Sequence, residues 1–422
     1  MSGQAAREGA IVLIRRALED GAPLDEAALP PALAPPDRAR ALTLARATLR
    51  WLGPVDAVLA PFLSRAPAPA ARAILRLGAT ELLALGEAAH GAVDGAVRLT
   101  KAGRKTAPLS GFVNAILRRV AAEGPAIWAE LDKPRLATPD WLWRALRADW
   151  GKAGAASLAA AHLRAPPLDL TPKDGDAATL AVRLDGAVTP TGSVRLERPG
   201  RISDMPGYGT GDWWAQDAAA AVPARLAGPG EGRRALDLCA APGGKTMQLA
   251  AAGWRVTALD NAETRMARLS ENLSRTALHA EIVIANAFVW RAEPFDLVLL
   301  DAPCTATGTI RRHPELPHIR DGSGVAAAAA LQARMADAAW ALTAPGGMML
   351  FCTCSLLQAE GEAQANAFLK RHEDAERVGI DAAETGDAAL ITRAGDFRAR
   401  PDFWPESGGM DGFFASRFRR RA

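Results

Sequence analysis

The stretch Leu236-Asp237-Leu238-Cys239-Ala240-Ala241-Pro242-Gly243-Gly244-Lys245-Thr246 decides the fold of the second half of this chain. An apolar run, a set of small residues and a polar helix-forming stretch indicate a strand, a tight loop and the start of a helix. Small residues let the backbone approach a ligand closely, and a helix N-terminus offers free N–H groups. The spacing matches neither a Walker A loop nor a G-x-G-x-x-G loop. A tight turn without a ligand is the alternative interpretation.

The sequence that follows this stretch alternates between strand and helix patterns. Strands are expected at residues 256–259, 281–285, 297–300 and 348–351, with helices over 263–273 and 326–342. Strands that alternate with helices predict a parallel, doubly wound sheet. Residues 411–418 are expected to form a closing strand. We therefore expect an α/β, Rossmann-like domain over residues 229–422.

The preceding residues are expected to hold two further domains, since 422 residues exceed one ordinary domain. Residues 1–127 are predicted to be all-α because apolar residues recur at helical spacing, for example over 38–52, 70–85 and 109–120. Residues 128–228 are predicted to form a small α+β module. This module has a helix after Pro139 and β-prone runs at 168–170, 180–184 and 194–196.

Composition restricts the class of protein. The 23% of charged residues and the net charge of +3 are ordinary, and do not by themselves indicate nucleic-acid binding. The four cysteines all lie in the second half, in a spacing that suits neither a secreted disulfide framework nor a zinc site. No signal peptide or apolar run of about 18 residues is present. We expect a cytoplasmic monomer without metal or membrane attachment.

Two polar residues at strand ends indicate a cofactor that contains adenosine. Asp260 ends the second expected strand, where an acid can accept hydrogen bonds from ribose hydroxyls. Asn286 follows the third strand, where a short polar side chain can meet an adenine edge. A dehydrogenase with a nicotinamide cofactor would fit these two residues as well.

Two cysteines follow the fourth and fifth expected strands and argue against hydride transfer. Cys304 closes Asp301-Ala302-Pro303-Cys304, and Cys354 lies in Thr353-Cys354-Ser355. Ligands of open α/β sheets bind outside the carboxyl ends of the strands. Two thiols there predict covalent sulfur chemistry on a substrate beside the cofactor. Cys239 and Cys352 are interpreted as packing residues, because most cysteines behave as small buried hydrophobes.

In combination, these motifs resemble the Nol/Nop/Sun family of RNA cytosine-5 methyltransferases. Residues 309–315 and 214–218 look like the RsmB (Sun) branch of that family, and residues 92–97 and 111–119 resemble its N-terminal NusB-like RNA-binding domain. The resemblance implies a class I methyltransferase domain that uses S-adenosylmethionine and acts on RNA. Small-subunit (16S) rRNA is the expected substrate.

The resemblance also implies roles for individual residues. Cys354 is the expected nucleophile toward cytosine carbon 6, Cys304 assists release of the product, and Asp301 bonds or protonates ring nitrogen 3. Lys245 and Arg311 are candidates for a positive setting around the nucleophile. The expected cofactor-binding residues are Cys239, Ala240, Ala241, Pro242, Gly243, Gly244, Lys245, Asp260, Arg265, Asn286 and Asp301. The family often has Asp where this chain has Asn286.

Three alternatives stay open. The same chemistry can act on tRNA, since only the N-terminal resemblance favours rRNA. A non-catalytic, NusB-like RNA-binding assembly factor is the second alternative, which the intact Cys304, Cys354 and Asp301 argue against. A nicotinamide dehydrogenase is the most distant one.

Overall fold

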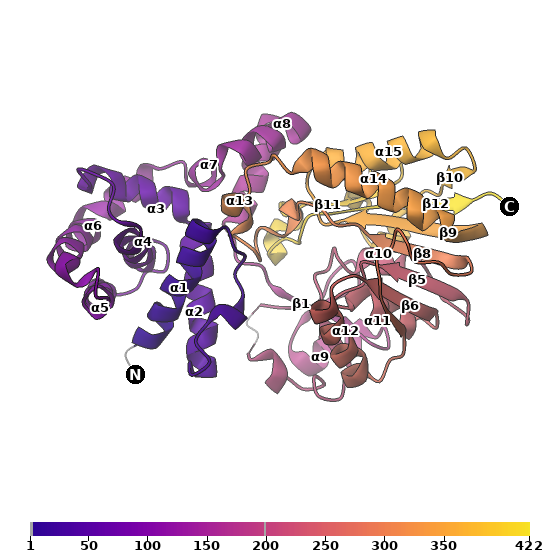
Figure 1. Ribbon diagram of the computed structural model, residues 1–422, viewed down its shortest axis with the longest axis horizontal. Coiled ribbons are helices and arrows are strands. Elements are labelled where there is room, and N and C mark those ends of the chain that lie inside the picture. The colour runs from indigo at the N-terminus through magenta and orange to yellow at the C-terminus, as the bar shows by residue number, and fades with distance from the viewer. Residues whose placement is uncertain (1–2, 198–199) are drawn as a thin grey trace. The chain divides into compact units, whose positions relative to one another are not determined.

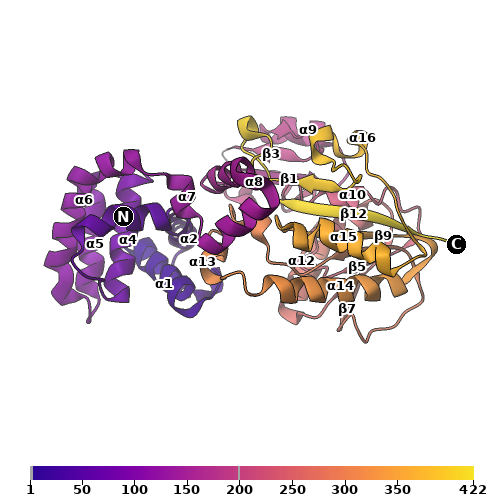
Figure 2. The same cartoon turned by 90° about the horizontal axis from the view of Figure 1, so that it is seen from above.

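A computed structural model describes residues 3–197 and 200–422, in which the chain folds into two compact units (Figures 1 and 2). The first unit comprises the chain up to Ala165 together with Ile310–Ser323, and the second comprises Pro166–Thr309 and Gly324–Ala422. The second unit is therefore interrupted in sequence by one segment of the first.

The first unit is helical, as the sequence predicted. Its α-helices are α1 (Gln4–Asp20), α2 (Pro35–Arg50), α3 (Leu52–Leu59), α4 (Pro69–Leu83), α5 (Ala89–Ala102), α6 (Ser110–Glu130), α7 (Lys133–Ala137), α8 (Asp140–His162) and α13 (Leu316–Ile319). Proline at the first position of α2 and α4 suits a helix start, because its missing N–H has no partner there. Apolar residues such as Leu13, Leu44 and Leu117 form the core of this unit. No helix in the described part of the chain is both long and apolar enough to cross a membrane.

A small sheet opens the second unit. Its strands are β1 (Leu168–Pro172), β2 (Ala187–Val188), β3 (Val194–Leu196) and β4 (Trp213–Ala215), in the order β2-β3-β1-β4. The β-prone interpretation of residues 180–184 is wrong, because they belong to helix α9 (Ala177–Leu184). The Asp176 carboxylate accepts a hydrogen bond from the Thr179 amide and caps this helix. Its buried residues Ala177, Leu180 and Ala181 have helical spacing.

The predicted 128–228 module is distributed over both units. Helices α7 and α8 belong to the first unit, and the small sheet belongs to the second. The assignment of residues 128–228 to one small α+β module stays a prediction.

The second sheet contains all five strands predicted for the α/β domain. They are β5 (Arg234–Leu238), β6 (Arg255–Asp260), β7 (Glu281–Ile284), β8 (Phe295–Asp301) and β9 (Thr343–Thr353). They pair in parallel, in the order β9-β8-β5-β6-β7. The expected closing strand, β12 (Phe413–Arg420), runs antiparallel to β9, and β10 (Ala375–Arg377) and β11 (Phe397–Ala399) pair with it. The sheet is therefore mixed rather than wholly parallel.

Helices cover both faces of this sheet (Figure 1). Helices α10 (Val222–Arg225), α11 (Gly244–Ala251) and α12 (Glu263–Thr276) lie on one face, and α14 (Val325–Ala341) and α15 (Glu362–Arg371) lie on the other. Side chains of β8 alternate accordingly, with Leu297 and Leu299 in one core and Val298 and Leu300 in the other. The architecture is the predicted Rossmann-like one, with the ends of β5, β6, β8 and β9 on a single edge.

A buried ion pair in the small sheet gives the first testable prediction. Arg195 donates two hydrogen bonds of 2.7 Å to Asp169, and the two side chains are only 4% and 0% exposed. Asp169→Ala leaves the guanidinium buried without its partner, so we expect a loss of about 3–5 kcal/mol in the free energy of unfolding. Urea denaturation measures this loss.

The half-exposed pair Arg183–Asp212 in the same unit serves as the control. Asp212→Ala should cost less than about 1 kcal/mol, because solvent screens an exposed pair. Equal losses from the two variants would contradict the assignment of Asp169 as a buried structural charge.

Candidate active site

The loop after β5 turns the backbone sharply into helix α11. Cys239 has a φ of 62° and Gly243 has a φ of 104°, both in the left-handed region. A Cβ atom at Gly243 would lie 2.9 Å from Cγ of Leu269, so the position requires glycine for its conformation and for its space. This turn places the N-terminus of α11 at the end of β5, where its first amides can meet a ligand.

Asp260 ends β6 as predicted, and Arg265 reaches the same point from α12. The Asp260 carboxylate is 3% exposed and accepts hydrogen bonds from the Ala262 amide at 2.9 Å and from the Arg265 guanidinium at 2.9 Å. Arg265 is 57% exposed, although the carboxylate it contacts is buried. Asn286 lies beyond the end of β7 and is exposed, with its side chain accepting a hydrogen bond from the Phe288 amide.

Lys245 joins the loop that follows β5 to the end of β8. Its Nζ lies 2.7 Å from Oδ2 of Asp301 and 4.9 Å from the ring centre of Phe413. Burial lowers the pKa of Lys245, but the negative charges of Asp301, Cys352 and Asp237 and the hydrogen bond to Asp301 together outweigh this effect, and the net pKa is raised. The charge of Lys245 is therefore directed at Asp301, and the pair holds α11 against β8.

Asp237 is a buried acid that the sequence did not single out. Its Oδ2 accepts a hydrogen bond of 2.6 Å from the Thr246 hydroxyl, and its Oδ1 is buried with no hydrogen-bond partner in the described part of the chain. Burial raises the pKa of Asp237 to about 7, although the Thr246 hydroxyl and Lys245 oppose the shift. Asp237 belongs to β5 and Thr246 belongs to α11, so their hydrogen bond connects the two elements on either side of the loop.

The two predicted thiols meet at the ends of β8 and β9. These strands pair in parallel with Asp301 opposite Cys352 (Figure 1), so Cys304 and Cys354 follow at equivalent places on the next loops. Their sulfur atoms lie 3.4 Å apart, and both side chains are half-buried and free of disulfide bonds. The geometry places two thiols on one small area at the sheet edge.

The pKa of the Cys304 thiol is strongly affected by its surroundings. The pKa of Cys304 is raised well above its ordinary value by its hydrogen bond with Cys354, by burial, and by the negative charges of Cys354 and Glu360. Burial also raises the pKa of Cys239 to about 12, and raises that of the fully buried Cys352. These two residues pack, as the sequence analysis expected.

Several residues named with the site lie in the helical unit. Arg311 is 1% exposed there, and His313 lies 3.5 Å from the carboxylate of Glu315. Two arginines near the C-terminus have acidic partners, because Arg417 pairs with Glu384 and Arg420 pairs with Asp374. Lys101, Arg104, Lys105, Arg118 and Arg119 are exposed on α5, α6 and the segment between them.

The sequence analysis missed the polar residues that hold the thiol loops. Glu360 is fully buried and binds the residues that follow both cysteines, Thr305 and Ser355. Gln332, also fully buried, reaches the same carboxylate from α14. The sequence signal was a charged residue six positions after the second cysteine, in a stretch without a recognised motif.

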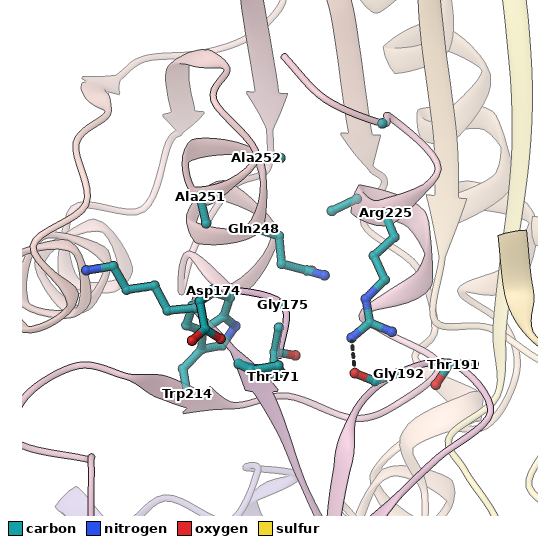
Figure 3. Close-up of a pocket in the computed structure, with 14 residues that line it drawn as sticks. Thr171, Asp174, Gly175, Thr191, Gly192, Trp214, Arg225, Gln248, Ala251 and Ala252 are labelled. Atoms are coloured by element: carbon teal, nitrogen blue, oxygen red, sulfur yellow. Dashed lines mark hydrogen bonds between the residues drawn. The ribbon is translucent and has the colours of Figure 1, made fainter. Parts of the chain in front are cut away.

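A separate cavity of about 460 Å³ lies in the second unit, between the small sheet and helices α10 and α11 (Figure 3). Its lining includes Thr171, Lys173, Gly192, Arg225 and Gln248, and none of the predicted site residues. Arg225 reaches from α10 to donate a hydrogen bond of 3.1 Å to the Gly192 carbonyl. The two thiols and the charged residues of the strand ends lie outside this cavity.

The fold and the site define the class of this protein: a Rossmann-like methyltransferase domain joined to a helical NusB-type domain. Two family models match the chain, one for 16S rRNA methyltransferase RsmB/F over residues 224–419 and one for the NusB family over residues 4–122. The ribosomal RNA small subunit methyltransferase B of Xanthomonas campestris is 35% identical over 98% of this chain and 96% of its own length. The protein of the same name from Pseudomonas putida is 35% identical over 90% of each chain.

Solved structures share the fold. PH0851 has a TM-score of 0.77 at 21% identity, and the match covers 99% of each chain. NSun6 from Pyrococcus horikoshii, solved with SFG, has a TM-score of 0.57 at 18% identity over 67% of this chain and 98% of its own. The chain belongs to the RsmB/F family of methyltransferases, and it is an RNA methyltransferase.

The buried Asp237 predicts a pH-dependent stability. Between the ordinary pKa of 3.8 and the raised value of about 7, the native state binds more protons than the unfolded state, so stability falls as pH rises through this window. Asp237→Asn removes the titration. The difference in the free energy of unfolding, Asp237→Asn minus wild type, should therefore become more positive from pH 4 to pH 8. The change should be on the order of 3–4 kcal/mol at most. Urea denaturation at the two pH values measures it, and a difference independent of pH would contradict the assignment.

Proposed function

We propose that the protein transfers a methyl group from S-adenosylmethionine to carbon 5 of a cytosine in small-subunit (16S) rRNA. The observation that carries this proposal is the pair of free thiols, 3.4 Å apart, at the strand-end edge beside the cofactor loop. The expectations that the protein acts in the cytoplasm and as a monomer belong to the same proposal.

The residues at the strand ends suit the proposed cofactor. The buried Asp260 carboxylate can accept hydrogen bonds from ribose hydroxyls once the exposed Arg265 moves away, and the exposed Asn286 can meet the adenine edge. The backbone of residues 239–245 and the first amides of α11 offer close approach and free donors. When bound, S-adenosylmethionine supplies an electrophilic methyl group on a sulfonium sulfur.

Cys354 is the proposed nucleophile. Carbon 5 of cytosine is a poor nucleophile, and addition of a thiolate to carbon 6 converts carbon 5 into an enamine-like carbon that can attack the methyl group. The raised pKa of Cys304 favours its protonated form, which suits Cys304 to the later step and not to the nucleophilic attack. Asp301, which Lys245 holds at the edge, bonds or protonates ring nitrogen 3 and so stabilises the adduct.

Cys304 is the proposed base for release. When Cys354 is bonded to carbon 6, it no longer provides the hydrogen bond and the negative charge that raise the Cys304 pKa. Cys304 can then lose its proton to solvent and take the carbon 5 proton. The electron pair of that C–H bond forms the carbon 5–carbon 6 double bond, and Cys354 leaves as a thiolate.

The nucleophile is tested by Cys354→Ala and Cys354→Ser. Neither variant can form the thioether bond to carbon 6, so methyl transfer from labelled cofactor should fall at least about 1,000-fold. Calorimetric titration with S-adenosylmethionine controls for folding and should give wild-type affinity. Turnover near the wild-type rate would rule out Cys354 as the nucleophile.

The second thiol is tested by Cys304→Ala. Without the base, the adduct forms but is not resolved, so a covalent protein–RNA complex should accumulate on denaturing gels. Full turnover by this variant would show that the two-thiol mechanism is wrong.

The RNA substrate is tested by methyl transfer to 16S rRNA and to tRNA, with the labelled nucleotide mapped in each. We expect transfer to a cytosine of 16S rRNA. Transfer to tRNA alone would replace the rRNA assignment, and failure to bind S-adenosylmethionine would favour a non-catalytic RNA-binding assembly factor.

A further inference from the structure

A fully buried carboxylate lies between the two thiol loops. Oε1 of Glu360 accepts hydrogen bonds from the Thr305 amide at 2.9 Å and from the Gln332 side-chain amide at 3.0 Å. Oε2 accepts hydrogen bonds from the hydroxyls of Ser355, at 2.6 Å, and of Thr305. Glu360 itself ends the short 3-10 helix η6 (Gln358–Glu360) and is 0% exposed.

The partners of this carboxylate are the direct neighbours of the thiols. Thr305 follows Cys304 in the chain, and Ser355 follows Cys354. Gln332 also donates a hydrogen bond of 3.0 Å to the carbonyl of Pro303, so both neighbours of Cys304 are held. A single side chain therefore bonds to both loops that carry the sulfurs.

The two loops are also bonded to each other next to this carboxylate. The Gly308 amide donates to the Cys354 carbonyl at 2.9 Å, and the Leu356 amide donates to the Thr307 hydroxyl at 2.9 Å. Gly308 has no space for a side chain, because a Cβ atom there would lie 2.8 Å from the Cys354 carbonyl oxygen. The backbones of the two loops thus approach each other closely.

The network requires a carboxylate rather than an amide. Four donor groups from three residues, Thr305, Ser355 and Gln332, donate to Glu360, and an ionised carboxyl group only accepts, through two oxygens with about four lone-pair sites. Glutamine would direct an N–H₂ group at two of these donors. An apolar residue would leave the buried Thr305 amide without a partner, which costs about 1–3 kcal/mol.

We propose that Glu360 is a positioning residue, which sets the separation and orientation of the Cys304 and Cys354 sulfurs for their successive roles. This inference rests on the proposed two-thiol reaction. In this proposal Glu360 acts on the thiols through Thr305 and Ser355, and not by direct contact with the base or the cofactor.

Glu360 also acts on Cys304 through its charge. The pKa of Cys304 is raised by its hydrogen bond with Cys354, by burial and by the charge of Cys354. The negative charge of Glu360 raises this pKa further, and a hydrogen bond from the Ala306 backbone lowers it. Removal of the charge should therefore make Cys304 more acidic. A purely structural residue would not produce this change.

The first test measures the thiol without any methyl transfer. In a Cys354→Ala background, the rate of Cys304 alkylation by iodoacetamide is followed against pH, with peptide mapping to identify the modified cysteine. Adding Glu360→Gln should shift the profile to lower pH, because a negative charge near the thiol is removed. Asp396→Asn in the same background removes another buried carboxylate, one bonded to Ser416, and should leave the profile in place. An unchanged profile with Glu360→Gln would overturn the electrostatic part of the proposal.

The second test separates positioning from binding. Glu360→Gln should lower kcat by about 10- to 100-fold, because misplacement of reacting groups by about 1 Å costs a factor of that order. The KM for RNA and the affinity for S-adenosylmethionine should stay within about twofold. Unchanged kcat, or a loss confined to KM, would overturn the proposal.

Variants of Thr305 keep the proposal testable if Glu360→Gln does not fold. Thr305→Val removes the hydroxyl bond to Glu360 at nearly constant volume and should lower kcat. Thr305→Ser keeps that bond, so its kcat should stay near the wild-type value. Equal kcat values for the two variants would contradict the positioning role. A wild-type protein that transfers no methyl group would instead contradict the proposed function, while the alkylation profile would still report on the Glu360–Cys304 interaction.

Discussion

The site depends on the parallel register of β8 with β9. Asp301 lies opposite Cys352 in this pairing, so the loops that follow begin side by side and their cysteines meet with sulfurs 3.4 Å apart. A shift of one residue would turn every β8 side chain to the opposite face and would separate the loops. The alternation of Leu297, Val298 and Leu299 between two cores holds the register, because a shift would exchange these cores. Hydrophobic packing of the sheet therefore decides the geometry of the thiols.

The pair Lys245–Asp301 connects this geometry to the cofactor loop. Lys245 follows the tight turn after β5, and Asp301 ends β8, so their contact fixes the neighbouring strand ends relative to each other. A buried charge is costly without a partner, which explains why the lysine can lie beneath the loop only with the carboxylate beside it. The same edge thus holds a donor-rich loop for an anion or ribose and a pair of thiols for a base. The proposed methyl transfer to cytosine uses both features.

The strand ends could be predicted from the sequence, and the network behind them could not. Asp260, Cys304 and Cys354 each follow an apolar run, and parallel strands bring their carboxyl ends to one edge. Glu360 meets Thr305 across 55 positions of sequence, and hydroxyls or amides at such separations have no periodic signature. Residues 180–184 are too short a run to distinguish strand from helix, and the decisive signal was the cap at Asp176. The assignment of residues 310–323 to the helical unit also had no local signal.

The central claim is that Cys354 bonds to the cytosine and Cys304 releases it. The most direct measurement uses RNA with 5-fluorocytosine at the target position, because fluorine cannot leave carbon 5 as a proton does. Wild-type protein with S-adenosylmethionine should then be trapped, and mass spectrometry should find the methylated nucleotide on the peptide that contains Cys354. A nucleotide attached to Cys304, or no adduct under conditions in which unsubstituted RNA is methylated, would contradict the account.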